Sequence, residues 1–410
     1  NNNPSNKILI IGITGTKGKS SGANFIWSAL QSCNIKTGIL STANIKIGEK
    51  EYLNNYHMTM PSPFIIQKFI KRCLKENCEA VIIETTSEGI KQYRHIGINY
   101  DIVIFTNLTP EHIESHGSFE NYRKAKQQIF KNLIKNKKKI LPKFGLIKKT
   151  IIVNGDSPEY YNFYKFKADQ KIIYGILNKD SDVKADIKFI DKNQTVFIYN
   201  NKEIKLNILG EFNVYNALCA IAVSKALNLN IDLTIKGLES LKYIPGRMEI
   251  IQKNPFMVII DYAHEKNSLS NVLITAKKLI DKGRIIIVIG AEGGGRDVQK
   301  RFLMGELAAQ LADFVIITNV DPYDEDPIKI IDDIKNSALK NGKILNTNLF
   351  TIPDRKEAIT KALKLAKEKD IVIITGKGSE QSMVIKDKRI KWDDREITKK
   401  ILYEINMNNN

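Results

Sequence analysis

The sequence predicts an α/β protein with two domains: a P-loop domain built on a parallel sheet, and a C-terminal Rossmann-like α/β domain. Short runs rich in Ile and Val recur along the chain and alternate with longer amphipathic stretches, which is the pattern of parallel strands joined by helices. The first apolar run leads directly into a glycine-rich loop. The length of 410 residues also exceeds what one ordinary hydrophobic core organises.

The glycine-rich loop lies between the first predicted strand and the first predicted helix. From residue 12 to residue 21 it reads Gly-Ile-Thr-Gly-Thr-Lys-Gly-Lys-Ser-Ser, with Ile13 where the common Walker A pattern has its first glycine. Backbone N–H groups of such a loop can surround an anion, Lys19 can reach terminal phosphates, and the Ser20 hydroxyl can bind Mg²⁺. We expect a nucleotide here; a glycine-rich turn without a phosphate is the alternative.

Two further strands of the first domain are expected to end beside this loop. Residues 80–84 form a short apolar run that ends on Glu84, and residues 100–107 form another that ends on Thr106 and Asn107. The carboxyl ends of parallel strands meet at one edge of a sheet, where ligands bind. Glu84 is therefore a candidate carboxylate for Mg²⁺. A helix-capping role for this acid is the alternative.

Several smaller elements complete the first domain, separated by Gly, Pro and polar residues. They are a strand at 37–42, a hairpin around Gly48, a helix at 64–77, an antiparallel flank at 186–190, 194–199 and 202–209, and a helix from 210 to 227.

Two histidines follow the strand that ends at residue 107. His112 and His116 lie between a proline and a glycine, so they belong to a loop rather than to a zinc-binding helix. We interpret His112 as a candidate metal ligand and His116 as structural. Ser118 then caps a predicted helix on which Tyr122 and Lys126 lie one turn apart on the same face.

A second α/β domain begins where the pattern breaks and restarts, around a Pro-Gly-Arg sequence. We expect the domains to be residues 1–245 and 246–410. Apolar runs in the second domain predict strands at 256–261, 284–290, 314–319 and 370–376, and the stretches between them predict helices such as 299–311 and 354–368.

The composition is that of a soluble globular protein, with 43% hydrophobic and 26% charged residues. No run approaches the roughly 20 apolar residues of a membrane span, and no leader opens the chain, so we expect a cytoplasmic protein. The cysteines lack paired metal-ligand spacing and are expected to be buried thiols; they are Cys33, Cys73, Cys78 and Cys219.

The formal charge of +18 raises nucleic-acid binding as a hypothesis. The lysines are spread, however, and the densest run, residues 135–149, lies between two predicted elements. We interpret the excess charge as a solvated surface and expect no nucleic-acid partner. A positive field would still favour anionic substrates.

Six motifs, in this order, resemble those of the Mur ligases and together span nearly the whole chain. They are the loop motif at 12–20, the segment from Thr106 to Lys126, Gly-Glu-Phe-Asn-Val-Tyr-Asn-Ala from 210, Pro-Gly-Arg-Met-Glu from 245, Asp-Tyr-Ala-His from 261 and Gly-Lys-Gly-Ser-Glu from 376. The chain is most similar to the branch that adds the third peptide residue to UDP-N-acetylmuramoyl-dipeptide.

This resemblance implies an ATP- and Mg²⁺-dependent ligase that joins a small-molecule carboxylate to an amino acid. In the family reaction a substrate carboxylate attacks the γ-phosphate to give an acyl phosphate. An amine then displaces phosphate and leaves an amide.

The resemblance also implies roles for individual residues. Lys126 matches a lysine that such ligases carbamylate, and it would lie with Ser20, Glu84 and His112 around the metal ions, while Lys19 holds the β- and γ-phosphates. The implied nucleotide-binding residues are Gly15, Thr16, Gly18, Lys19, Ser20, Ser21, Asn213 and Asn216, with Arg247 and Asp261 as C-terminal-domain groups that close on ATP.

Departures from the family pattern fall where substrates would lie. The resembling enzymes carry an N-terminal UDP-binding domain, whereas here the phosphate loop begins at once, so a protein partner that supplies this function is one hypothesis. Met60 replaces a threonine, Glu88 and Ser379 each replace a histidine, and Tyr323 replaces an arginine that follows Asn-Pro in diaminopimelate-adding enzymes. The expected substrate residues are Thr59, Thr86, Ser87, Asp321, Tyr323, Gly376 and Glu380.

These departures affect which amine and which acceptor we expect, and which alternative functions stay open. Tyr323 cannot neutralise a distal carboxylate, and the acids Asp321, Asp324 and Glu325 would repel one, so we expect a basic or neutral amine rather than diaminopimelate. The acceptor is expected to be a peptide-like or cell-wall-precursor carboxylate. The alternatives are a Mur-like ligase of a natural-product or lipid-linked carboxylate, and a nucleotide-binding subunit that needs a partner. A folate-type glutamate ligase fits the last two motifs less well.

Overall fold

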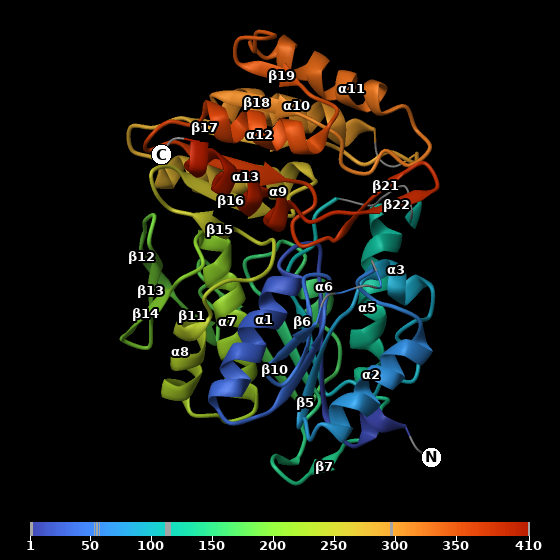
Figure 1. Ribbon diagram of the computed structural model, residues 1–410. Helices are drawn as coiled ribbons and strands as arrows, with labels where there is room; N and C mark the ends of the chain where they lie inside the picture. The colour runs from blue at the N-terminus through green and yellow to red at the C-terminus, as the bar shows by residue number, and fades with distance from the viewer. Residues whose placement is uncertain are drawn as a thin grey trace. The chain divides into compact units, whose positions relative to one another are not determined.

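The computed structural model divides into two compact units, residues 1–242 and residues 243–410. It describes residues 3–52, 54, 56, 58–110, 116–295 and 298–408. Each unit is an α/β body with its own sheet and its own core (Figure 1). In the part of the chain that is described, no helix is long and apolar enough to cross a membrane.

The central sheet of the first unit has nine described strands in the order β11-β10-β9-β6-β1-β5-β2-β3-β4. The ladder is parallel from β11 to β2, and β3 and β4 extend it as an antiparallel hairpin. The strands are β1 (Leu9–Thr14), β2 (Thr37–Leu40), β3 (Ile45–Ile47), β4 (Lys50–Tyr52), β5 (Ala80–Glu84), β6 (Ile102–Phe105), β9 (Thr150–Asn154), β10 (Gln170–Gly175) and β11 (Val183–Lys184).

Helices cover both faces of this sheet, as buried parallel strands require. Figure 1 shows α1, α7 and α8 grouped on one side and α2, α3 and α5 on the other, and the packing of α1 against α7 and α8 agrees. The helices are α1 (Lys19–Ser32), α2 (Pro63–Lys75), α3 (Ser87–Lys91), α5 (Phe119–Leu133), α6 (Tyr161–Tyr164), α7 (Glu211–Ala226) and α8 (Ile231–Ser240).

Two small sheets flank the first unit. The predicted antiparallel flank is confirmed as β12 (Asp186–Ile190), β13 (Thr195–Tyr199) and β14 (Lys202–Leu206). A second hairpin pairs β7 (Ile140–Leu141) with β8 (Gly145–Leu146). The prediction missed β9 and β10, which extend the parallel sheet.

The second unit has a six-stranded sheet among its described residues, in the order β15-β16-β20-β17-β18-β19, antiparallel only at β15. Its strands are β15 (Glu249–Gln252), β16 (Met257–Asp261), β17 (Ile285–Ile289), β18 (Phe314–Ile317), β19 (Leu349–Thr351) and β20 (Ile371–Thr375), with a separate hairpin of β21 (Ser382–Ile385) and β22 (Lys388–Lys391). The helices are α9 (Lys266–Leu279), α10 (Gln299–Leu311), α11 (Pro327–Lys340), α12 (Arg355–Leu365) and α13 (Asp394–Asn408).

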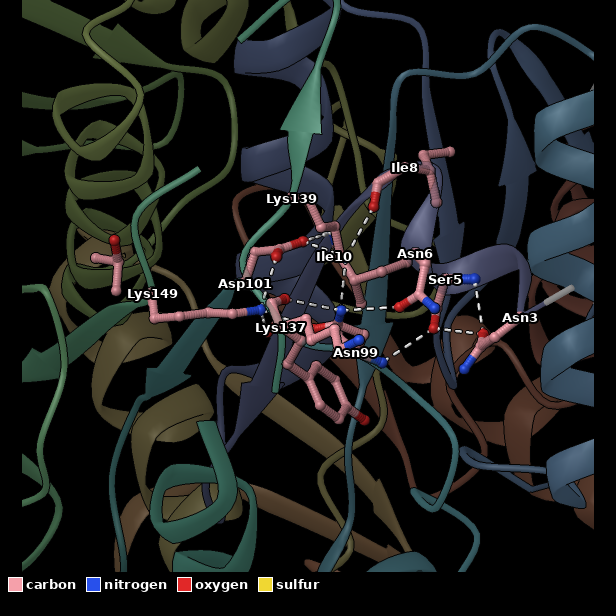
Figure 2. Close-up of polar contacts among 12 residues, drawn as sticks. Asn3, Ser5, Asn6, Ile8, Ile10, Asn99, Asp101, Lys137, Lys139 and Lys149 are labelled. Carbon is pink, nitrogen blue, oxygen red and sulfur yellow. Dashed lines mark hydrogen bonds and ion pairs between the residues drawn. The ribbon is translucent and has the colours of Figure 1, made fainter. Parts of the chain in front are cut away.

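A buried cluster of charges lies where β1, β6 and β9 begin (Figure 2). Lys139 donates to Asp101 Oδ2 at 2.5 Å and to the carbonyls of Ile8 and Asn99, while Lys149 donates to Asp101 Oδ1 at 2.9 Å. Both lysines are buried, so the interpretation of the 135–149 run as a solvated surface was wrong for these two side chains. The cluster, here called the Asp101 cluster, ties the strand starts to the β7–β8 hairpin.

The cysteines carry free thiols, and Cys73, Cys78 and Cys219 are buried as predicted, whereas the prediction was wrong for Cys33, which is half-buried.

Candidate functional site

The phosphate loop connects β1 to α1, and two of its glycines are required by close contacts. A side chain at Gly15 would place Cβ 1.9 Å from Thr106 Oγ1, and one at Gly18 would place it 2.9 Å from Asn216 Oδ1. Gly18 also has a φ of +82° where the helix begins, a conformation that favours glycine. These glycines therefore allow β6 and α7 to approach the loop.

The end of β6 holds the loop in shape through the backbone. Thr16 N–H donates to the Asn107 carbonyl and Lys17 N–H donates to Asn107 Oδ1, each at 2.8 Å. Thr106 Oγ1 donates in turn to the Lys17 carbonyl at 2.7 Å. This long-range clamp follows from the register of β1 and β6, in which Thr14 pairs with Phe105.

Glu84 lies at the start of α1 because β5 pairs with β1 and places Glu84 opposite Ile13. Its Oε2 accepts hydrogen bonds from the Ser20 hydroxyl at 2.7 Å and from Thr42 N–H at 2.9 Å. Lys19 Nζ lies 3.9 Å from Oε1 and donates to the Thr16 carbonyl at 2.8 Å. The strand-end argument is thus confirmed in its geometry, with a carboxylate, a hydroxyl and an ammonium meeting beside the loop.

Lys126 reaches the same loop from α5. Ser118 caps this helix as predicted, accepting from Asn121 N–H, and the next turns carry Tyr122 and Lys126 inward. Lys126 Nζ donates to the Gly15 carbonyl at 2.8 Å and lies 4.6 Å from the centre of the Tyr122 ring. The Tyr122 hydroxyl contacts Thr16 Oγ1 at 3.2 Å. A lysine only 1% exposed is therefore aimed at the phosphate loop.

His116 lies nearer to the site than its predicted structural role implied. Its Nε2 is 3.2 Å from Ser87 Oγ, and its ring lies 5.2 Å from that of Tyr122. Burial lowers the pKa of His116, which favours the neutral imidazole. His112, the predicted metal ligand, lies outside the described residues.

The remaining predicted residues of the first unit fall into two groups. Asn216 Nδ2 donates to Asn213 Oδ1 at 3.0 Å, which orients the Asn216 amide toward Gly18. On the other side of the loop, Thr59 Oγ1 lies 2.6 Å from Thr42 Oγ1, next to the backbone that contacts Glu84. Thr86 caps α3 through Gly89 N–H. Ser21 is buried in the first turn of α1.

Oxygen ligands suited to Mg²⁺ are present beside the loop, although a complete cage is not. Glu84 Oε2 and Ser20 Oγ are hard donors, and Mg²⁺ usually takes only one or two carboxylates because substrate phosphates and water complete its shell. No group of three or more His, Cys, Asp or Glu side chains arranged to hold a metal occurs among the described residues. The donor set therefore fits a metal ion that arrives with a phosphate ligand.

In the second unit, Asp261 ends β16, and Arg247 lies just before β15, which runs antiparallel to β16. Both residues therefore lie at the carboxyl edge of the parallel strands. Asp261 accepts from the N–H groups of Met248 and Ala263, both at 2.8 Å. The guanidinium of Arg247 lies over the Tyr262 ring, 4.3 Å from its centre. Asp261 thus orders the backbone just after Arg247 and just after Tyr262.

A buried network follows β20 and was only partly predicted. Lys377 Nζ donates to Asp321 Oδ2 at 2.7 Å and lies 2.5 Å from Glu380 Oε2, and the Tyr262 hydroxyl donates to Glu380 Oε1 at 3.0 Å. Burial raises the pKa of Glu380. For Lys377, burial opposes the charged form, but the carboxylates of Glu380 and Asp321 leave its pKa above the ordinary value. Sequence reasoning named the two acids and missed Lys377 and Tyr262.

Tyr323 lies above Gly294 on a strained turn. Its φ is +51°, and its N–H contacts the Val384 carbonyl at 3.4 Å. A side chain at Gly294 would come within 3.3 Å of the Tyr323 ring. The absence of a side chain at Gly294 therefore leaves room for this ring. Gly376, also predicted here, has a φ of +107° beside Val320.

The acids around Tyr323 are mostly neutralised, which corrects part of the sequence argument. The buried guanidinium of Arg301 donates to both oxygens of Glu325 at 2.7 Å and to Asp333 at 3.0 Å. Asp321 is paired with Lys377. Of the three acids expected to repel a distal carboxylate, only Asp324 would therefore still do so. The case against diaminopimelate then depends mainly on the absence of an arginine at position 323.

Known proteins resemble this chain along almost its whole length. Residues 13–224 match the family description "Mur ligase middle domain" and residues 246–378 match "Mur ligase, glutamate ligase domain". The UDP-N-acetylmuramoyl-L-alanyl-D-glutamate--2,6-diaminopimelate ligase 1 of Clostridium acetobutylicum is 35% identical over 98% of this chain and 80% of its own. The UDP-N-acetylmuramyl-tripeptide synthetase of Borrelia garinii subsp. bavariensis is 35% identical over 98% and 78%.

Solved structures agree in fold. The structure of a UDP-N-acetylmuramoyl-L-alanyl-D-glutamate--2,6-diaminopimelate ligase has a TM-score of 0.64 and 25% identity, covering 98% of this chain and 79% of that one. Folylpolyglutamate synthase of Mycobacterium tuberculosis, complexed with ADP and AMPPCP, has a TM-score of 0.71 and 17% identity over 92% and 90%.

Proposed function

The chain belongs to the Mur ligase family and is an ATP-dependent ligase that forms amide bonds, and we propose that it acts through an acyl phosphate at the loop of the first unit. The observation that carries this proposal is the convergence of Lys19, Glu84 and Lys126 on one phosphate loop. These side chains come from three separate segments, and their charges suit a triphosphate with its metal ions.

We assign the phosphates of ATP to the loop amides and to Lys19. In the described structure the Lys19 ammonium donates to the Thr16 carbonyl, and a γ-phosphate would offer it a more strongly charged acceptor. Ser20 and Glu84 would hold Mg²⁺, and His112 is the family-implied ligand of a second ion. When bound, Mg²⁺ would neutralise charge that develops on the transferred phosphoryl group.

We assign to Lys126 a carbamate. Its neutral amine would attack CO₂, forming an N–C bond and releasing a proton, which converts a buried cation into an anion. The Tyr122 ring and the Gly15 carbonyl, its present contacts, fix the position of Nζ next to the loop. A fixed anion there would help to hold Mg²⁺ and to orient the γ-phosphate.

The remaining nucleotide contacts are proposed from the family. Asn213 and Asn216 would lie near the base, and their hydrogen bond to each other supports a preorganised pair. Arg247 and Asp261 would act from the second unit. Because Asp261 already accepts two backbone N–H groups, we expect it to act by holding the Arg247 segment in place.

For the acceptor, we propose a UDP-N-acetylmuramoyl-dipeptide or a related peptide carboxylate. This rests on relatives whose names give UDP-N-acetylmuramoyl-L-alanyl-D-glutamate as a substrate. Thr59, Thr86 and Ser87 line the same side of the loop as Glu84 and would face the acceptor. A natural-product or lipid-linked carboxylate is the alternative.

For the amine, we propose an amino acid without a distal carboxylate, read by Asp321, Tyr323, Gly376 and Glu380. Tyr323 can stack and donate one hydrogen bond but cannot make a bidentate charge contact. Lys377 pairs with both Asp321 and Glu380 and so fixes the positions of these two carboxylates. The amine would therefore be neutral or basic in its side chain.

A scan of carboxylates and amines for ATP-dependent phosphate release tests this function. We expect release that needs both a carboxylate and an amine, together with an amide product detected by mass spectrometry. Binding of ATP without turnover for any pair would favour the alternative of a nucleotide-binding subunit that needs a protein partner. Turnover with a carboxylate that carries no UDP-sugar would favour the alternative acceptors.

A further inference from the structure

The β7–β8 hairpin exposes an apolar pair where a soluble hairpin would carry polar side chains. Ile140 and Leu146 lie directly opposite each other in the antiparallel register. Their side chains are 80% and 62% exposed, whereas Leu141, which points to the other face, is buried. In Figure 1 this hairpin projects from the lower end of the first unit, near the β7 label. Single exposed aliphatic residues are common, but a cross-strand pair is a small apolar patch.

The hairpin is anchored at both of its ends. Lys139 precedes β7 and Lys149 follows β8, and both are bonded to Asp101 in the buried cluster (Figure 2). The two arms are also tied together, because Ile147 N–H donates to the Lys139 carbonyl at 2.8 Å. The Ile140 and Leu146 side chains are therefore presented by a supported hairpin, so that little ordering would be needed before they bind.

The surroundings of this pair are strongly basic. Residues 121–155 contain no Asp or Glu. Two exposed lysines of the hairpin region have acidic partners, Lys138 with Asp169 at 2.8 Å and Lys143 with Glu79 at 3.5 Å. Between residues 135 and 149, all of which the structure describes, three further exposed lysines form no ion pair; they are Lys135, Lys137 and Lys148.

The hairpin lies away from the phosphate loop within the first unit. The Asp101 cluster joins residues just before β1, β6 and β9, which are the amino ends of parallel strands, whereas the loop follows the carboxyl end of β1. A surface bound to the hairpin would therefore leave the loop accessible.

We propose that this hairpin docks the protein on an anionic lipid surface. Ile140 and Leu146 enter the interface between headgroups and acyl chains, and Lys135, Lys137 and Lys148 contact lipid phosphates. Apolar insertion combined with basic flanks is the recognised chemistry of reversible membrane attachment. A nucleic acid fits less well, because unpaired bases stack on aromatic side chains and the exposed pair is aliphatic.

Co-sedimentation with lipid vesicles tests this proposal on the full chain. The probes are phosphatidylcholine vesicles with and without about one-third phosphatidylglycerol. We expect binding only to the anionic vesicles, weakened by added salt. The double variant Ile140→Ser with Leu146→Ser should lower partitioning at least about tenfold. Replacing the three unpaired lysines by glutamine should lower it by about a hundredfold.

Matched controls separate the hairpin from general surface properties. Leu177→Ser removes an equally exposed aliphatic side chain, 77% exposed, from another part of the first unit. A triple glutamine variant removes three exposed lysines elsewhere on that unit, Lys179, Lys184 and Lys192. Both controls should bind anionic vesicles like the parent protein. All variants should keep the parent's thermal unfolding and its ATP-dependent turnover in solution.

Three outcomes would overturn the proposal. The first is that anionic vesicles bind no better than phosphatidylcholine vesicles. The second is that the Ile140 and Leu146 double variant binds them as well as the parent does. The third is that single-stranded RNA, but not vesicles, binds in a way that depends on the three lysines, which would assign the basic surface to nucleic acid.

Discussion

The hydroxyl of Ser20 donates a 2.7 Å hydrogen bond to Oε2 of Glu84, a residue 64 positions away in the sequence. Glu84→Gln keeps an acceptor for Ser20 but removes the charge. We expect the Mg²⁺ concentration for half-maximal activity to rise at least about tenfold, because a carboxylate ligand is lost. Steady-state phosphate release over a Mg²⁺ series measures this.

Glu120→Gln is the matched control for this experiment, since Glu120 is an exposed acid that pairs with Lys124 on α5. Its Mg²⁺ dependence should equal that of the parent. An unchanged Mg²⁺ dependence in Glu84→Gln would remove Glu84 from the metal site.

Lys126 should be essential and carbamylated. Lys126→Ala should lower kcat by at least about a hundredfold, because it removes the anion proposed to orient the γ-phosphate, and added bicarbonate should not restore it. Carbon-13 NMR of the parent protein in labelled bicarbonate should show a carbamate resonance that is missing in the variant. Lys124→Ala, on the exposed side of the same helix, should keep both the signal and the activity.

Full activity of Lys126→Ala would remove the carbamate from the mechanism. A carbamate signal that persists in this variant would assign the modification to another amine.

Tyr323 should discriminate against a second carboxylate. In competition assays, lysine, ornithine or alanine should give a higher kcat/KM than diaminopimelate. Tyr323→Arg should shift the ratio of these kcat/KM values toward diaminopimelate by about tenfold or more, because it adds a charged contact worth about 1.5 kcal/mol or more. Tyr323→Phe is the control, because it keeps the ring against Gly294 and adds no charge. The highest kcat/KM for diaminopimelate in the parent protein would refute this assignment.

The Asp101 cluster should make stability rise with pH. Burial lowers the pKa of Lys139 to about 8, against about 10.4 in an unfolded chain. Between these values the unfolded chain binds more protons than the folded one, so the free energy of unfolding increases with pH. From about pH 8 to about pH 9.5 the parent should gain about 1–2 kcal/mol relative to Lys139→Met.

The two tryptophans allow this gain in the free energy of unfolding to be measured for the first unit alone. Trp27 lies on α1 and Trp392 follows β22, so a Trp392→Phe background makes fluorescence report unfolding of the first unit. Lys137→Met removes a neighbouring exposed lysine and should keep the parent's rise in the free energy of unfolding with pH. An equal rise with pH in Lys139→Met would show that Lys139 does not titrate in this range.

Local sequence patterns were sufficient for much of the fold and for the loop. The apolar runs at 80–84 and 100–107 became β5 and β6, because buried parallel strands leave a continuous apolar signal. The glycine spacing indicated the phosphate loop, and parallel topology then placed Glu84 beside it. The roles of these residues toward ATP and Mg²⁺ stay predictions.

What the sequence did not show depends on contacts between distant segments. Lys139 and Lys149 look like surface lysines within a basic run, and only the meeting of β1, β6 and β9 brings Asp101 to them. The same applies to Arg301 on α10, which neutralises Glu325 in the loop before α11. Lys377 belonged to a quoted motif, but its pairing with Asp321 spans 56 residues and has no local signal.

The most direct test of the central claim follows oxygen from the carboxylate substrate. When an acceptor labelled with oxygen-18 in its carboxylate is supplied with ATP and an amine, an acyl phosphate transfers one carboxylate oxygen to the released phosphate, because the amine displaces phosphate together with that oxygen. Mass spectrometry of the phosphate should therefore find the label, in step with amide formation. Unlabelled phosphate accompanying amide product would contradict an acyl phosphate, and phosphate release that ignores the carboxylate would contradict ligation itself.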